Sequence, residues 1–176
     1  MKNKWNYQGL GQVKYGKAGT YQAAVEWLDE VGGSLEDWGC GCAYAKGFVK
    51  KSRYIGIEGS KNDFADRCDV DLREYKSEAD SILLKHVLDH NPEWKKIIQN
   101  AIDSFRQRMV IIFLRNWGKE TKIVLTHGDP KYPGVNDLQF RKEDVLEFVG
   151  PYLVKEEHVP PNEETPNHCV LLYLQK

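Results

Sequence analysis

Short apolar stretches typical of β-strands alternate with longer amphipathic stretches typical of helices along most of this chain. The clearest strand pattern covers residues 109–114, whose uninterrupted apolar content is typical of a strand buried on both faces. Just before it, residues 91–105 carry Trp94, Ile98 and Phe105 on one continuous helical face. This alternation predicts an α/β fold with a mostly parallel sheet and helices on both faces.

The same patterns place the remaining elements and the edge where a ligand would bind. Further strands are predicted at residues 34–38, 53–58, 68–72, 81–84 and 122–125, and further helices at 20–31, 43–51, 60–67 and 141–149. Two closing strands, 153–159 and 169–174, are joined by a link too short for a parallel crossover, so we expect an antiparallel hairpin. Ligands bind beyond the carboxyl ends of the strands in such sheets, so the residues after each strand are the candidates for a site.

Length and composition predict one soluble domain. The chain has 176 residues, of which 41% are hydrophobic and 29% charged, and this excludes a disordered or fibrous protein. No apolar run approaches the ~20 residues that cross a bilayer, and the N-terminus lacks the apolar core of a signal peptide. The four cysteines are too scattered for a disulfide framework, so we expect a cytoplasmic protein. A net charge of -1 argues against nucleic acid as a partner.

We expect a single domain over residues 20–176, preceded by an aromatic segment at 1–19. This segment carries Trp5, Tyr7 and Tyr15. It acts either as a lid over an acceptor pocket or as a strap packed on the core, and the sequence favours neither. The oligomeric state is also open.

The first candidate motif joins a strand to a glycine-rich turn. The strand at 34–38 carries Asp37 and is followed by Gly39, Cys40 and Gly41, after which a helix is predicted. Glycines have no Cβ, so a ligand can approach the backbone closely, and the Asp37 carboxylate suits a cation such as an amino-acid ammonium. A tight turn without any ligand would give the same pattern, and both interpretations stay open.

Two further acidic motifs follow the next predicted strands. Glu58 ends the second strand, where a carboxylate can accept both hydroxyls of a ribose. After the third, Asp69 or Asp71 can accept from the exocyclic amine of adenine, and Asp71 is better placed if the strand ends near Val70. Each acid taken alone is equally explained as a solvated residue in a surface turn.

Taken together, the glycine-rich loop at 37–43, the strand end at 54–60 and the segment 80–90 resemble the class I S-adenosylmethionine-dependent methyltransferases. The resemblance implies a Rossmann-like, seven-stranded, mostly parallel sheet that ends in an antiparallel hairpin, with S-adenosyl-L-methionine as cofactor. It implies that Asp37, Gly39 and Gly41 line the methionine moiety, Glu58 the ribose and Asp71 the adenine. The other cofactor contacts that we expect on this basis are Cys40, Gly59, Ser60, Leu72 and Lys85.

The loop after the fourth predicted strand faces the transferred methyl group in this family, and here it contains His86 and His90. Neutral imidazole accepts protons near pH 7, so His86 is the first candidate for a general base and His90 the second. Either histidine also fits a purely structural role, and a methyl transfer driven by positioning needs no base. The expected activity is methyl transfer to a small-molecule acceptor, such as a sugar or metabolite hydroxyl.

The same residues also bear on functions other than methyl transfer. Ala43 replaces the family's third loop glycine, and Glu36 stands where the family prefers an apolar residue, which favours a non-catalytic or regulatory cofactor-binding module. A dinucleotide site needs a last glycine or alanine that the loop lacks. The Cys40-x-Cys42 pair has no second pair, so no metal site is expected. Residues 91–94 resemble an amino-methylating N-P-P-Y motif only superficially and are better placed as a helix cap at Asn91.

Overall fold

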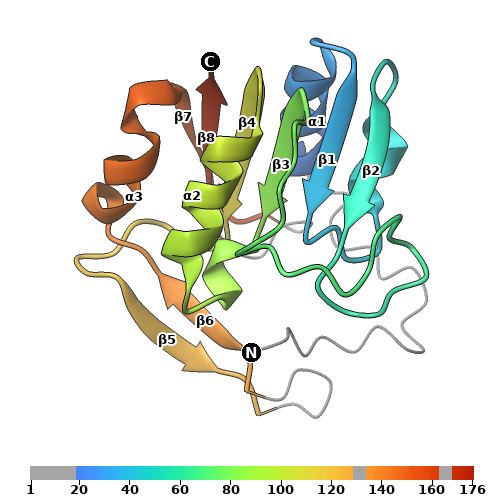
Figure 1. Cartoon of the computed structure of the whole chain (residues 1–176). Helices are drawn as coiled ribbons and strands as arrows, with labels where there is room; N and C mark the ends of the chain where they lie inside the picture. Colours follow the sequence, from blue (N-terminus) through green and yellow to red (C-terminus); the bar gives the residue numbers. More distant parts are fainter. Residues whose placement is uncertain (1–18, 129–133, 163–167) are drawn as a thin grey trace.

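The computed structural model describes residues 19–128, 134–162 and 168–176 of the chain. Its main sheet has six strands in the order β2-β1-β3-β4-β8-β7 (Figure 1). The first four strands in that order run parallel to one another. β8 runs antiparallel to both β4 and β7, so β7 and β8 form the closing antiparallel hairpin that the sequence predicts. Their bounds are β1 (Ser34–Trp38), β2 (Arg53–Ile57), β3 (Ser81–Lys85), β4 (Arg108–Phe113), β7 (Leu153–Val159) and β8 (Cys169–Gln175).

Helices cover both faces of this sheet, as expected. The α1 helix (Gly19–Asp29) lies on one face, and α2 (Trp94–Ser104) and α3 (Lys142–Val149) lie on the other (Figure 1). Successive strand residues point to opposite faces, so Leu83 packs in the cluster that includes α1, while Leu84 packs in the cluster that includes α2 and α3. Both faces of the inner strands are therefore buried, which explains their continuous apolar runs.

The predicted third strand at 68–72 is wrong, and the sheet has six strands rather than seven. Among the described residues, a single bridge, between Ile57 and Arg67, extends the sheet beyond β2. The Asp66 carboxylate takes the Gly56 N–H at 2.7 Å, and Asp69 has a left-handed φ of 57°. A side chain that captures a ladder donor competes with strand pairing, and the left-handed residue turns the chain away.

Two predicted helices also differ from the structure. The helix expected at 43–51 is a short 3-10 helix, η1 (Tyr44–Phe48), and residues 60–67 form turns instead of a helix. The expected cap at Asn91 is wrong as well, because the Asn91 amide donates to the Val87 carbonyl and α2 begins at Trp94. Short polar segments carry too little apolar periodicity to distinguish a helix from a turn.

A separate hairpin lies below the main sheet in Figure 1. It consists of β5 (Lys122–Thr126) and β6 (Asn136–Gln139), and the sequence analysis predicted only β5. Leu138 is buried in the core shared with α2, whereas every residue of β5 is exposed. The hairpin thus brings β6 to the carboxyl edge of the sheet, beside the short 3-10 helix η2 (Leu88–His90).

Candidate cofactor and acceptor site

The turn after β1 is held against the end of β2. The backbone N–H groups of Gly39 and Cys40 both donate to the Ile57 carbonyl, at 2.8 and 3.1 Å. Gly39 has a φ of 75°, and a Cβ built on it would lie 2.5 Å from a methyl group of Val87. Gly41 and Ala43 are also left-handed, with φ of 54° and 52°. This turn therefore needs glycine at residue 39 for both conformation and space.

The Glu58 carboxylate joins two of the predicted motifs. Its Oε2 accepts the Gly41 N–H at 3.0 Å, and its Oε1 accepts those of Gly59 and Ser60 at 2.8 and 3.3 Å. Glu58 is 2% exposed. The Glu58 carboxylate therefore ties the turn after β1 to the backbone that follows β2.

Asn62 completes this junction, and no sequence pattern pointed to it. Its side-chain amide donates to the Gly41 carbonyl, and its Oδ1 accepts the Phe64 N–H at 2.9 Å. The residue is buried. Glu58 therefore holds the N–H of Gly41, and Asn62 holds its C=O.

Asp37 lies in a second polar group on the face of the sheet that α1 covers. It is 2% exposed, and its Oδ2 accepts the Tyr54 hydroxyl at 2.8 Å. Burial raises the pKa of Asp37 to about 7, and the nearby Glu58 charge acts in the same direction. Asp37 and Glu58 are thus brought together, as the sequence analysis expected.

Lys85 belongs to the same group. Its ammonium lies 3.6 Å from the centre of the Tyr21 ring, and the charges of Asp37 and Lys85 interact. Burial lowers the pKa of Lys85 to about 8, against the opposing effect of Asp37. An acidic and a basic group therefore share this corner, which is the pattern that a zwitterion would complement.

Asp71 is not brought to this group. Its exposed carboxylate forms an ion pair with Arg73, whose hydrogen bond holds the pKa of Asp71 at about 2. Arg73 also contacts Glu93, beside α2. The backbone nevertheless stays close, because the Val70 N–H donates to the Glu58 carbonyl at 3.1 Å. Leu72 is buried in the core beside α2 and offers no side-chain polar group to a ligand.

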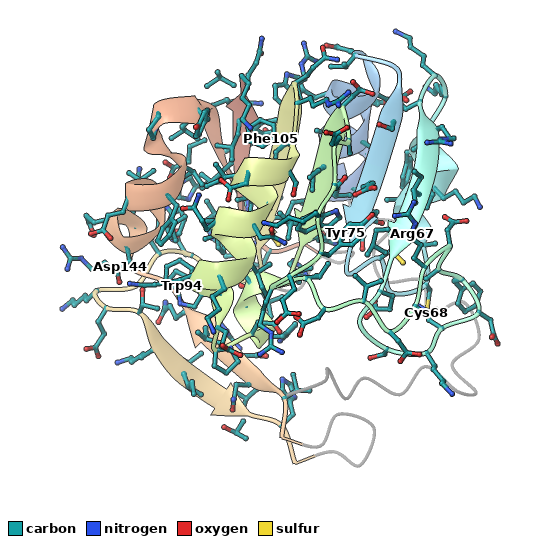
Figure 2. All side chains as sticks on the ribbon, in the orientation of Figure 1. Arg67, Cys68, Tyr75, Trp94, Phe105 and Asp144 are labelled. Atoms are coloured by element: carbon teal, nitrogen blue, oxygen red, sulfur yellow. The ribbon has the colours of Figure 1, made fainter. Side chains whose placement is uncertain are left out.

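The unexpected acid at residue 36 has partners of its own. The Glu36 carboxylate accepts the Trp38 indole N–H at 2.9 Å and the Tyr75 hydroxyl at 3.0 Å. Tyr75 also accepts a hydrogen bond from Arg67, and the two residues lie side by side near the carboxyl ends of β1 and β2 (Figure 2). Glu36 is therefore a satisfied buried acid, which explains how the strand tolerates it where an apolar residue is usual.

The first histidine candidate directly follows β3. His86 has a left-handed φ of 56°, and its N–H donates to the Ile112 carbonyl at 2.9 Å. Its Nε2 lies 3.9 Å from the Cys169 sulfur. Burial lowers the pKa of His86 well below its usual value, so the ring is neutral at pH 7. A non-glycine residue in this conformation stores strain of the kind that clusters at functional sites.

The second histidine candidate is held by Asp137, a residue that the sequence analysis missed. The His90 Nδ1 lies 3.2 Å from the Asp137 carboxylate, which also binds His127 at 2.9 Å and Arg115 at 2.8 Å. Asp137 is 3% exposed. Burial opposes the protonation of His90, but the bond to Asp137 outweighs it and raises the pKa of His90. Asp137 belongs to the unpredicted β6, in a turn-rich segment without a motif.

Neither a metal-binding cluster nor a membrane-spanning helix is found among the described residues. Within the described ranges, no three His, Cys, Asp or Glu side chains are grouped so that they could hold a metal ion. None of the helices in the described part of the chain has the length and apolar character needed to cross a membrane. The four cysteines are free thiols. The expected aromatic lid or strap lies outside the described residues, apart from its last residue.

Comparison with known proteins identifies the fold. No protein-family model matches the chain, and no curated protein matches its sequence. Among solved structures, it is similar to 1,6-didemethyltoxoflavin-N1-methyltransferase of Burkholderia thailandensis, which has 1,6-didemethyltoxoflavin and S-adenosylhomocysteine bound. That match has a TM-score of 0.70 and 14% identity over 90% of this chain and 78% of that one.

Two other solved structures show the range of proteins with this architecture. Magnesium protoporphyrin IX methyltransferase of Synechocystis PCC 6803, with S-adenosylmethionine bound, matches with a TM-score of 0.62, 14% identity and coverage of 89% and 78%. The [4+2]-cyclase SpnF matches with a TM-score of 0.57, 14% identity and coverage of 88% and 81%. The fold implied by the sequence motifs is thereby confirmed: the chain has the fold of the class I S-adenosylmethionine-dependent methyltransferases.

Proposed function

We propose that this chain binds S-adenosyl-L-methionine at the carboxyl edge of β1 and β2 and transfers its methyl group to a small-molecule acceptor. The observation that carries the proposal is the junction of Glu58 with Gly41, with Asp37 alongside. These residues come from the two strand ends where the sequence motifs predicted the cofactor. The similar methyltransferase structures have S-adenosylhomocysteine or S-adenosylmethionine bound, which supports S-adenosyl-L-methionine as the cofactor.

Each end of the cofactor has candidate partners. The turn at Gly39, Cys40 and Gly41 would line the methionine moiety. The Asp37 carboxylate would hold its ammonium and Lys85 its carboxylate, because both charges face the same corner. These two ion pairs together recognise the zwitterionic tail of the cofactor.

The ribose and adenine would lie toward β2 and the segment after it. The Glu58 carboxylate, at the end of β2 and beside Gly59 and Ser60, would accept hydrogen bonds from the ribose hydroxyls. Asp71 would have to release its ion pair with Arg73 before it could accept a hydrogen bond from the adenine amine. Leu72 would then lie against the adenine ring. Asp71 is therefore the contact whose present geometry supports it least.

The acceptor would lie beyond β3 and β4, opposite the sulfonium. The nucleophile of the acceptor attacks the methyl carbon in line with the breaking C–S bond, and S-adenosylhomocysteine leaves. His86 is neutral there and is the first candidate to take a proton from a hydroxyl, and His90 is the second. The free thiols favour a cytoplasmic setting for this reaction.

A calorimetric titration with S-adenosylhomocysteine tests the proposal. The wild type should bind it in preference to NAD. Glu58→Gln should weaken binding about 10- to 150-fold, since a hydrogen bond to a charged group contributes roughly 1.5–3 kcal/mol. Glu147→Gln, an exposed change on α3, is the matched control. Preferential binding of NAD, or equal affinities for both variants, would contradict the assignment.

A non-catalytic cofactor-binding module is the second candidate. The [4+2]-cyclase SpnF supports this candidate, because it has the same fold and is named for a reaction other than methyl transfer. Incubation with methyl-labelled S-adenosylmethionine and a small-molecule extract separates the two functions. An enzyme yields a labelled product and S-adenosylhomocysteine, whereas a module binds the cofactor and leaves it unchanged.

A further inference from the structure

The Asp37 carboxylate is fixed through one of its two oxygens. Its Oδ2 accepts the Tyr54 hydroxyl at 2.8 Å. Its Oδ1 accepts no hydrogen bond from the described residues, and it is not among the unpaired atoms that they fully enclose. One oxygen is therefore held in place by Tyr54, and the other is left to accept a hydrogen bond from a ligand.

A glycine between the two side chains lets the Tyr54 hydroxyl reach Asp37. Gly56 pairs with Asp37 across β1 and β2, and Tyr54 lies two residues before it, so all three positions share one face of the sheet. A Cβ built on Gly56 would lie 3.4 Å from a carbon of the Tyr54 ring and 3.0 Å from the Cys40 sulfur. The Tyr54 ring therefore lies against the backbone of Gly56, where a side chain at residue 56 would otherwise stand.

The bond lies in the corner that the proposed function gives to the methionine moiety. Leu83 of β3 pairs with Asp37, and Lys85 follows two residues later on the same face. The Lys85 ammonium lies 3.6 Å from the centre of the Tyr21 ring, at the start of α1. Tyr54 thus belongs to the same polar group as the acid and the base, although no motif in the sequence marked it.

The hydroxyl of Tyr54 acts on the charge state of Asp37. Burial, and after it the charge of Asp37, raise the pKa of Tyr54, so the hydroxyl stays protonated and remains a donor. Burial and the charge of Glu58 raise the pKa of Asp37, whereas the bond from Tyr54 and the charge of Lys85 lower it. The titratable groups that face Asp37 are Tyr21 of α1, Cys40 of the turn, Tyr54 of β2, Glu58 at its end and Lys85 of β3.

We propose that Tyr54 is a positioning residue of the cofactor site, which keeps the Asp37 carboxylate ionised and in place so that its second oxygen can bind the ammonium of S-adenosyl-L-methionine. The inference rests on the proposed function and deepens it. Because only the ionised form of Asp37 forms this ion pair, cofactor binding depends on pH near neutrality.

Calorimetric titration with S-adenosylhomocysteine at two pH values tests the role of Tyr54. Tyr54→Phe keeps the ring and removes the hydroxyl. At about pH 6.5 it should bind about tenfold more weakly than the wild type, the fold-change that one hydrogen bond to a charged group makes. At about pH 8, above the Asp37 pKa of about 7, the two affinities should lie within about threefold, because Asp37 is then ionised in the wild type and partly so in the variant.

Tyr173→Phe is the matched control. The Tyr173 hydroxyl also donates to an acid, Glu157, at 3.2 Å, and its ring packs in the same α1-side cluster as Tyr54. It contacts Trp27, near the end of α1 away from Tyr21. This variant removes the same kind of bond outside the site, so its affinity for S-adenosylhomocysteine should match that of the wild type at both pH values.

Two measurements keep the test independent of the binding of the variant. The affinity of the wild type should rise several-fold between about pH 6 and about pH 7.5, as Asp37 ionises. Carbon-13 NMR titration of the Asp37 carboxyl in the free protein should give a higher midpoint in Tyr54→Phe than in the wild type. A flat wild-type profile or an unchanged Asp37 midpoint would overturn the inference.

The outcomes are separable from those of the proposed function. If the wild type binds S-adenosylhomocysteine but Tyr54→Phe binds equally well at about pH 6.5, or loses the same factor at both pH values, the inference is wrong and the proposed function stands. If the wild type does not bind it, the proposed function fails, and the NMR titration still decides whether Tyr54 keeps Asp37 ionised.

Discussion

The Glu58 carboxylate accepts the backbone N–H of Gly41 at 3.0 Å, so the acid at the end of β2 holds the turn that follows β1. Because Glu58 also accepts two further backbone N–H groups, its side chain organises the site before any ligand binds. The loop and the acid that the sequence motifs presented separately form one unit.

Removing this carboxylate should cost stability as well as affinity. Glu58→Ala leaves three backbone donors without their acceptor, and we expect the free energy of unfolding to fall by about 2–4 kcal/mol. Urea denaturation followed by circular dichroism measures the change. Glu147→Ala should stay within about 0.5 kcal/mol of wild type, as surface substitutions do. A similar stability for the two variants would mean that the junction contributes nothing.

The turn itself should tolerate alanine poorly at residue 39. Gly39→Ala forces a side chain into a left-handed conformation with a φ of 75° and toward Val87, and we expect a loss of about 1–3 kcal/mol. Gly47 in η1 is the matched control, because a Cβ there meets nothing within 4 Å. Thermal unfolding of both variants gives the comparison, and an equal shift would argue against strain at Gly39.

Asp29 provides a pH-dependent test of the fold away from the site. Its carboxylate accepts the backbone N–H groups of Lys50, Lys51 and Ser52. Burial alone would raise the pKa of Asp29, but these hydrogen bonds outweigh burial and lower it. Stability from a lowered pKa is present above the unfolded value of about 4 and is lost as the pH falls through the folded value.

Asp29→Asn should therefore be about 1.5–3 kcal/mol less stable than wild type at pH 7, the size of hydrogen bonds to a charged group. The difference should shrink as the pH falls below about 4, because the wild-type carboxylate is then protonated. Urea denaturation from pH 2 to pH 7 measures it. A difference that stays constant over this range would show that the ionised form has no special role.

Asp137 should control the titration of His90. The pKa of His90 is raised despite burial because Asp137 binds its ring. Asp137→Asn removes that charge, and we expect the His90 titration midpoint to fall. NMR titration of the His90 ring resonances measures the midpoint, with Asp63→Asn, an exposed change, as the matched control. An unchanged His90 midpoint in Asp137→Asn, or an equal shift in Asp63→Asn, would contradict the assignment.

The raised pKa of His90 also has a consequence for stability. The protonated His90 stabilises the fold below its unfolded pKa of about 6.5, and this contribution is lost as the pH rises through the folded value. In Asp137→Asn, that loss should move to lower pH. Unfolding midpoints measured from pH 5 to pH 9 give the comparison, and parallel curves for the two proteins would exclude the coupling.

The strands of the main sheet could be predicted because apolar periodicity records burial. Leu35, Leu83 and Val110 alternate with residues of the opposite face, so both the strands and their burial follow from local pattern. The same logic failed at residues 68–72. There, the Asp66 side chain accepts the N–H of Gly56, ten residues earlier, and apolar periodicity does not record a polar contact of this kind.

The candidate site divides in the same way. Glycines and strand-end acids are recognisable from sequence because each needs a particular residue type at a particular place, as Gly39, Asp37 and Glu58 show. Asn62 and Asp137 carry no such signal. Their roles depend on which backbone group or ring the fold brings within hydrogen-bond distance, and each partner lies on another element or across a turn.

By itself, the sequence determined the α/β class, most strands of the sheet and the turn after β1, because backbone conformation and burial are local demands on residue type. Tertiary structure alone decided that the main sheet has six strands among the described residues, that Asn62 reaches the Gly41 carbonyl, and that Asp137 holds the His90 ring. Those outcomes depend on which polar groups meet across the fold, and hydrogen-bond geometry between distant residues is not encoded in any short stretch of chain.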